Sequence, residues 1–213
     1  MAISGQEYED LKKRWDSLLT RLGCGQAAPG IYATILGGYE HPGRHYHGGR
    51  HLIQVLNELA GVRDQLQDAA AVELALWLHD LVYEPGSAAN EAISAAAARS
   101  YALQLRGSSD FAASIAALIL ATTHSDAPTD RDAAFLLDID LAVLGYPPEA
   151  FAAYEDGIRQ EFSFLPQPAY RRQRRTVLEA FLARSSIYYT AYFHERYERA
   201  ARENISGLLA GWP

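Results

Sequence analysis

Residues 69–80, AAAVELALWLHD, form a nearly uninterrupted apolar stretch that ends on a histidine–aspartate pair. Glu73 is the one charged residue before His79, so a helix formed here is apolar on almost every face. Such a helix belongs in the middle of a bundle, where other helices cover all of its sides. The stretch therefore predicts a helical core that carries His79 and Asp80 at its end.

The sequence on both sides of this stretch is also helical in pattern. Apolar residues recur at helical spacing, and glycine, proline and serine interrupt the pattern where helices are expected to begin or end. Residues 26–43 are expected to form a connection with at most one or two helical turns. Thr129 and Asp132 resemble a capping box at the start of a later helix. We expect helices over about 6–22, from near 47 past 59, 69–81, 90–105, 108–122, 129–145, 147–162, 169–184 and 190–209.

These patterns predict an all-α fold. The chain has no hairpin signature and no sustained alternation of apolar and polar residues. Its 213 residues are enough for one domain with a sizeable core. We therefore expect a single helical domain over residues 1–213, with a metal-site core at about 41–145 and further helices at about 148–209.

Composition narrows the classes of function. With 19 basic and 26 acidic residues the formal charge is −7, which disfavours nucleic acid and anionic membranes as partners. No stretch is apolar enough to suggest a membrane span or a secretion signal. The single cysteine, Cys24, fits a reducing compartment, and we expect a cytoplasmic protein. The sequence leaves a homo-oligomer open.

The most unusual local feature is a cluster of histidines. Four of the seven histidines lie between residues 41 and 51, in and just before the run RHYHGGRH at 44–51. His47 and His51 are four residues apart, so a helix would place them on one face. Histidine is the commonest metal ligand, although a lone histidine is more often an ordinary surface residue. The clustering favours a metal site.

Carboxylates add to this interpretation. Asp80 follows a long apolar helix, where a carboxylate is unfavourable against the helix dipole unless a cation lies nearby. An exposed helix end is the simpler alternative. Asp138 and Asp140 flank Ile139 in another apolar helix and also require a counter-charge. Two imidazoles and two carboxylates suit a divalent transition-metal ion with open positions for water and substrate.

The order His51, His79-Asp80 and Asp140 resembles the H…HD…D signature of the HD-domain superfamily of metal-dependent phosphohydrolases. The flanking residues are similar to a bacterial group of predicted HD phosphohydrolases over about residues 6–209. The similar segments are RHYHxxxH at 44–51, WxHDxVY at 77–83, NExxSA at 90–95, LxIDLxxLG at 137–145 and ARxN at 201–204.

The resemblance implies roles for individual residues. It implies one divalent ion (Mn, Fe, Co, Ni, Zn or Mg) held by His51, His79, Asp80 and Asp140, and it favours Asp140 over Asp138. His47 corresponds to the general acid of the similar cyclic-nucleotide phosphodiesterases. Glu91 is a candidate for orienting the attacking water, although a glutamate in the first turn of a helix is an equally good explanation. A second ion stays open, since the extra histidines of binuclear members are not evident. The candidate substrate-binding residues are Arg44, His124 and Arg159, of which His124 is also placed to help a second ion.

The expected activity is hydrolysis of a small phosphorylated metabolite or nucleotide, a phosphomonoester or phosphodiester, by metal-activated water. One alternative is a di-iron oxygenase on the same fold, which needs more ligands than the sequence provides. The other is a non-catalytic nucleotide-binding or regulatory module, which the four intact candidate ligands disfavour.

Overall fold

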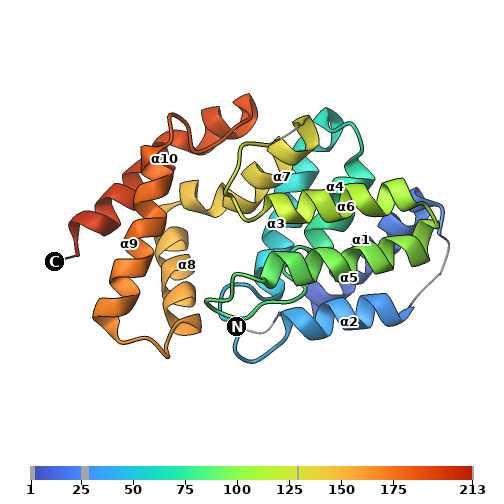
Figure 1. Ribbon diagram of the computed structural model, residues 1–213, viewed down its shortest axis with the longest axis horizontal. Coiled ribbons are helices and arrows are strands. Elements are labelled where there is room, and N and C mark those ends of the chain that lie inside the picture. The colour runs from blue at the N-terminus through green and yellow to red at the C-terminus, as the bar shows by residue number, and fades with distance from the viewer. Residues whose placement is uncertain (1–2, 25–28, 129, 213) are drawn as a thin grey trace. The chain divides into compact units, whose positions relative to one another are not determined.

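The computed structural model describes residues 3–24, 29–128 and 130–212, and in this part of the chain the regular secondary structure is all helical, with no β-strand (Figure 1). The all-α prediction is confirmed. None of the described helices combines the length and apolar character needed to cross a membrane. The helices are α1 (Gly5–Leu22), α2 (Pro29–Tyr39), α3 (Gly49–Val62), the 3-10 turn η1 (Arg63–Gln65), α4 (Ala69–Leu78), α5 (Asn90–Arg106), α6 (Ser109–Ala121), α7 (Arg131–Leu141), the 3-10 turn η2 (Ala142–Gly145), α8 (Pro148–Glu161), α9 (Gln167–Ala183) and α10 (Ala191–Ala210).

The chain divides into two compact units, Met1–Leu136 and Leu137–Pro213, and the division falls within α7. The first unit contains α1 to α6, and the second contains η2 and α8 to α10. The expected single domain therefore stays a prediction, and each unit is described by itself below.

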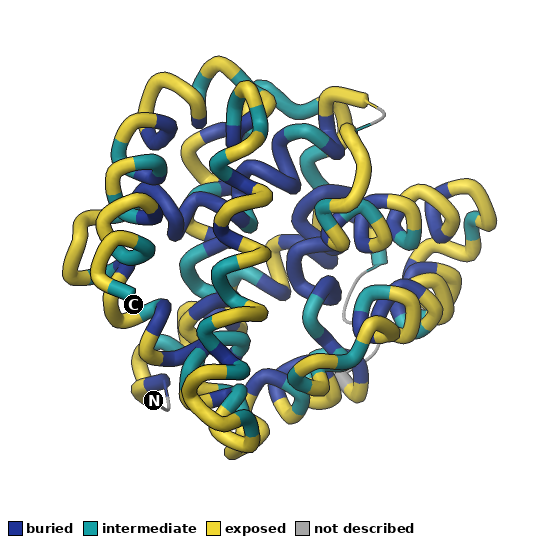
Figure 2. Tube along the Cα trace, turned by 60° about the vertical axis from the view of Figure 1, so that its left-hand side comes forward, coloured by how far each residue is buried: buried dark blue, intermediate teal, exposed yellow. Residues whose placement is uncertain are grey.

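Helix α4 is the centre of the first unit, as its apolar sequence predicts. It packs against α1, α3, α5 and α6 (Figure 1). Every residue from Ala71 to His79 is buried, and Figure 2 shows such buried stretches in dark blue. Trp77 of α4 packs edge-on against Trp15 of α1, with ring centroids 5.3 Å apart. The large apolar area removed from water here is the main source of stability for this unit.

The helices of the first unit are bounded by the capping chemistry that the sequence carries. At the start of α1, the Ser4 hydroxyl accepts from the backbone N–H of Glu7, and the Glu7 carboxylate accepts from the N–H of Ser4. Gly23 ends the same helix in the left-handed region, at φ 73°, where glycine is favoured. Ser108 caps α6 through the N–H of Phe111.

The second unit is organised around η2, which packs against α8 and α10. A Cβ atom at Gly145 would lie 2.5 Å from Cβ of Tyr197, so only glycine permits this approach of η2 to α10. Asn204 of α10 donates from Nδ2 to the carbonyl oxygens of Leu144 and Tyr146, both at 2.9 Å. These contacts fix the chain directly after α7.

One local prediction was wrong, and another falls partly outside the described residues. The segment after Gly25 contains an 11-residue helix, α2, rather than one or two turns. The capping box predicted at the start of α7 is not tested; among the described residues, Oδ1 of Asp130 accepts from the N–H of Ala133, and Asp132 accepts from the backbone N–H groups of Gln67 and Asp68. Thr129, the other half of the predicted box, lies outside the described residues.

Candidate metal centre

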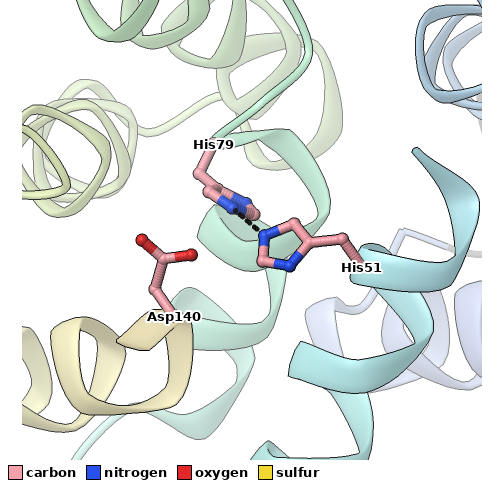
Figure 3. Close-up of side chains that lie close together, drawn as sticks. All are labelled: His51, His79 and Asp140. Carbon is pink, nitrogen blue, oxygen red and sulfur yellow. Dashed lines mark hydrogen bonds between the residues drawn. The ribbon is translucent and has the colours of Figure 1, made fainter. Parts of the chain in front are cut away.

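Two buried histidines of the first unit face each other. His51 lies in the first turn of α3 and His79 directly follows α4, and each side chain is 2% exposed. Their Nε2 atoms are 3.1 Å apart, joined by the dashed line in Figure 3. Nδ1 of His79 lies 2.9 Å from the carbonyl oxygen of Leu76 and can only donate there. That hydrogen bond places the lone pair of the neutral ring on Nε2, the arrangement found in histidines that bind metals.

Asp80 adds a third ligand atom to the histidine pair. Its Oδ2 atom lies 3.2 Å from Nε2 of His79 and 3.5 Å from Nε2 of His51. A point equidistant from three atoms with these separations lies about 1.9 Å from each, close to the ~2.0–2.2 Å of zinc–nitrogen and zinc–oxygen bonds. The three atoms therefore have the spacing of one face of a metal coordination sphere.

The carboxylate of Asp80 is suited to a cation rather than to the hydrogen-bond network of the protein. Burial raises the pKa of Asp80, but the nearby His79, His47 and His51 outweigh burial and hold this pKa below its ordinary value. Its buried Oδ2 atom has no partner with hydrogen-bond geometry among the described residues. A buried carboxylate oxygen in this state calls for an ion or an ordered water.

Asp140, in the last turn of α7, offers a further ligand. Figure 3 draws His51, His79 and Asp140, and these three residues could hold a metal ion.

Asp138, the other candidate ligand in the same helix, has a structural role as a hydrogen-bond acceptor. Its side chain is fully buried in the second unit. Oδ1 accepts from the N–H of Tyr189 at 2.8 Å, and Oδ2 accepts from both the N–H and the hydroxyl of Thr190 at 2.7 Å. Asp138 thus fixes the start of α10, which agrees with the preference for Asp140 as a ligand.

His47 lies beside the histidine pair on the loop before α3. Its ring centroid is 5.9 Å from that of His51. Its ring also stacks on Tyr83, with centroids 4.0 Å apart and an interplanar angle of 27°. The stacking holds the imidazole of His47 in one orientation next to the candidate metal ligands.

Arg44 connects this loop to the end of α4. Its guanidinium donates to the carbonyl oxygens of Asp80 at 2.5 Å, Leu81 at 2.9 Å and His47 at 3.2 Å. The same guanidinium lies 5.6 Å from the ring centroid of Tyr83. Substrate binding by Arg44 stays a prediction, and the donors observed here hold the backbone of two site residues. We therefore assign it a positioning role.

Two polar residues of α5 hold the loop that follows Asp80. The Ser94 hydroxyl accepts from the N–H of Val82 and donates to its carbonyl oxygen. The Asn90 side chain makes the equivalent pair of hydrogen bonds with the backbone of Glu84. Both residues belong to the NExxSA segment, but their hydrogen bonds to the loop after Asp80 were not predicted from the sequence. The signal available was the polarity of two residues at helical spacing, i and i+4, on an alanine-rich helix.

The remaining candidates are placed as follows. Glu91 lies in the first turn of α5, where the helix dipole favours a carboxylate. His124 follows α6 in the left-handed region at φ 54°, and it does not belong to the group of ligand atoms found among the described residues. In the second unit, Arg159 donates to Gln167 and to the carbonyl oxygens of Phe162 and Leu165. Arg159 thus holds the α8–α9 turn.

Comparisons of the chain with known protein families, curated proteins and solved structures found no match.

Proposed function

We propose that this protein is a metal-dependent hydrolase that acts on a phosphate ester of a small metabolite or nucleotide. The observation that carries the proposal is the convergence of His51 Nε2, His79 Nε2 and Asp80 Oδ2 at separations of 3.1–3.5 Å. Two buried imidazoles and a buried carboxylate oxygen at such separations have little use in a protein core unless a cation joins them.

The proposed ligands are His51, His79, Asp80 and Asp140. A donor set of two imidazoles and two carboxylates suits Mn, Fe, Co, Ni or Zn, and Mg fits it less well because Mg prefers oxygen ligands. A bound divalent ion supplies Lewis acidity and lowers the pKa of a water molecule that it holds. The HD-domain resemblance of the sequence gives the same four residues.

His47 is the proposed general acid. Its ring lies close to His51 and is held by stacking on Tyr83. A protonated imidazole in this position can give its proton to the oxygen of the leaving group, which otherwise departs as a poorly stabilised alkoxide. The hydrogen bond from Arg44 to the carbonyl oxygen of His47 holds the backbone of the acid.

Glu91 is the proposed residue that orients the attacking water. The loop between Asp80 and Glu91 is fixed by the hydrogen bonds of Asn90 and Ser94, so the start of α5 has a defined position in the first unit. A carboxylate there can accept a proton from water. Glu91→Gln should lower turnover without removing the metal, whereas a pure helix-dipole role would leave turnover unchanged.

Elemental analysis of protein purified without chelator tests the proposal. We expect about one equivalent of a divalent transition metal per chain in the wild type and in His45→Asn, an exposed neighbour in the same loop. Asp80→Asn should lose the metal while keeping its helical content. The metal found is then supplied in a screen of phosphomonoesters and phosphodiesters.

The metal content and the substrate screen together distinguish the candidate functions. Absence of metal after reconstitution, or full metal content in Asp80→Asn, would overturn the ligand assignment. Two irons per chain would favour the di-iron oxygenase. One metal with no turnover on any phosphate ester would favour a binding or regulatory module.

A further inference from the structure

A second polar site lies on another face of the first unit. A cavity of about 370 Å³ is bordered by α1, by the end of α3 with η1, and by α4. Its volume falls within the range of small-molecule sites. Arg63, which borders it, follows His51 by twelve residues, which corresponds to roughly 18 Å along a helix. The cavity is therefore separate from the metal ligands.

The cavity is strongly positive in a protein that is negative as a whole. Lys13, Arg14, Arg21 and Arg63 line it, and Glu73 is its single acidic residue. The chain as a whole carries a formal charge of −7. Four of the 19 basic side chains thus gather around one hollow, where their fields add to attract an anion.

The one carboxylate in the cavity does not neutralise this charge. Nη2 of Arg21 and Nη2 of Arg63 both donate to the same oxygen of Glu73, at 2.5 and 2.6 Å. Arg14 donates to the uncharged amide of Asn57 at 2.6 Å. The guanidinium charges of this cavity therefore exceed the negative charge that they contact.

Arg63 has an unused donor. Its Nη1 atom is buried and has no hydrogen-bond partner among the described residues. The side chain of Arg63 is 33% exposed and its Nη2 atom pairs with Glu73, so only the Nη1 atom is out of reach of water. An unpartnered donor is a reason to look for a ligand or an ordered water, and the positive lining is the observation that indicates an anion.

We propose that this cavity binds a multiply charged oxyanion, the phosphate or pyrophosphate group of a small metabolite. The planar forks of Arg14, Arg21 and Arg63 match the oxygens of a phosphate group. Lys13 also pairs with Asp10 at 3.5 Å, so the four cationic side chains contact two carboxylates, and the remaining charge of about +2 suits an anion of charge −2 better than a monocarboxylate. This binding does not depend on the proposed hydrolytic activity.

Calorimetric titration with pyrophosphate, at fixed ionic strength, tests the proposal. The Asp80→Asn variant is the background, so that pyrophosphate cannot bind through a metal at the other site. We expect one pyrophosphate per chain. Adding Lys13→Gln and Arg14→Gln together should weaken binding at least tenfold, and these changes leave the Arg21–Glu73–Arg63 contacts intact. Lys12→Gln is the matched control, because Lys12 pairs with Asp16 and does not line the cavity.

Three results would overturn the proposal. The first is the absence of binding at millimolar pyrophosphate. The second is unchanged affinity when Lys13 and Arg14 are replaced. The third is an equal loss of affinity in Lys12→Gln, which would show a general charge effect rather than a site.

Discussion

The guanidinium of Arg44 donates to the carbonyl oxygen of Asp80 at 2.5 Å, so an arginine on the loop before α3 holds the backbone of a candidate ligand that follows α4. Partners that orient ligands in this way commonly affect metal affinity by about 10–100-fold when they are removed. Arg44→Lys keeps the charge but loses the fork that contacts Asp80, Leu81 and His47 together.

We therefore expect Arg44→Lys to lower the affinity for the metal by about 10–100-fold, measured by competition with a chromophoric chelator. Arg50→Lys is the matched control, because Arg50 is exposed on the adjacent first turn of α3. Equal affinities in Arg44→Lys and the wild type would remove the positioning role.

Replacing His47 tests the general acid. His47→Gln should keep the metal and lower kcat by about 10²–10⁴ on an alkyl phosphate ester. The loss should be much smaller on p-nitrophenyl phosphate, because that leaving group departs without a proton. His45→Gln is the control for a loop histidine. A uniform loss on both substrates would instead indicate a role for His47 in binding.

Asp138 and Asp140 should respond differently to the same substitution. Asp138→Asn places an amide against the N–H groups of Tyr189 and Thr190, and we expect the free energy of unfolding to fall by roughly 2–4 kcal/mol. Asp140→Asn should change stability little and reduce metal content. Chemical denaturation and elemental analysis of both variants measure the two effects, and the opposite pattern would exchange the two assignments.

Acid should destabilise the second unit through Glu198. Burial opposes ionisation of this carboxyl, but hydrogen bonds from the N–H groups of Ile187 and Tyr188 and from Arg202 outweigh burial and lower the pKa of Glu198. A carboxyl with a lowered pKa in the folded state stabilises the fold above its unfolded value of 4.5, and this contribution is lost as the pH falls through the folded pKa.

Glu198→Gln should accordingly make thermal stability less dependent on pH below about 4.5. Melting temperatures of the wild type and the variant, taken from about pH 6 to about pH 3, measure the difference. The exposed Glu203→Gln is the control. Parallel melting curves for Glu198→Gln and the wild type would contradict the prediction.

Two glycines give a paired test of packing. Gly145→Ala should cost about 1–3 kcal/mol, because its Cβ would press against Tyr197 and the backbone of α10. Gly207 lies inside α10, and a Cβ atom there would meet no other atom within 4 Å, so Gly207→Ala should stabilise the helix by about 0.5–1 kcal/mol. Denaturant titration of both variants should show shifts of opposite sign, and a loss of stability in both would refute the packing argument.

Much of the fold could be predicted because the signals are local. The capping box of Ser4 and Glu7 and the left-handed Gly23 need no tertiary information, and both are visible in the sequence. Helix α2 was underestimated because its glycines have poor helix propensity. One of them, Gly38, is needed for contact: a Cβ there would lie 2.9 Å from the carbonyl oxygen of Leu81. Such a requirement comes from another element and cannot be inferred from the segment itself.

The residues of the candidate site also divide into those that local sequence reveals and those whose role depends on distant contacts. His79 and Asp80 could be identified because polar residues at the end of an apolar helix are conspicuous. The hydrogen bonds of Arg44 and Asp138 could not be predicted, because their partners, Asp80 and Tyr189, lie 36 and 51 positions away in the chain. An arginine beside histidines has the same sequence signature whether it binds a phosphate or a backbone carbonyl. Only the contacts distinguish the two.

Trp15 and Trp77 pack edge-on in the first unit, and their intrinsic fluorescence offers a way to monitor the metal centre. Two of the three tryptophans lie in the core of the first unit, and Trp77 precedes His79 by two residues. A paramagnetic ion such as Mn or Co, bound at His79, would quench the emission of Trp77 at short range. Occupancy of the metal centre could then be followed by intrinsic fluorescence, without a label and in every variant described above.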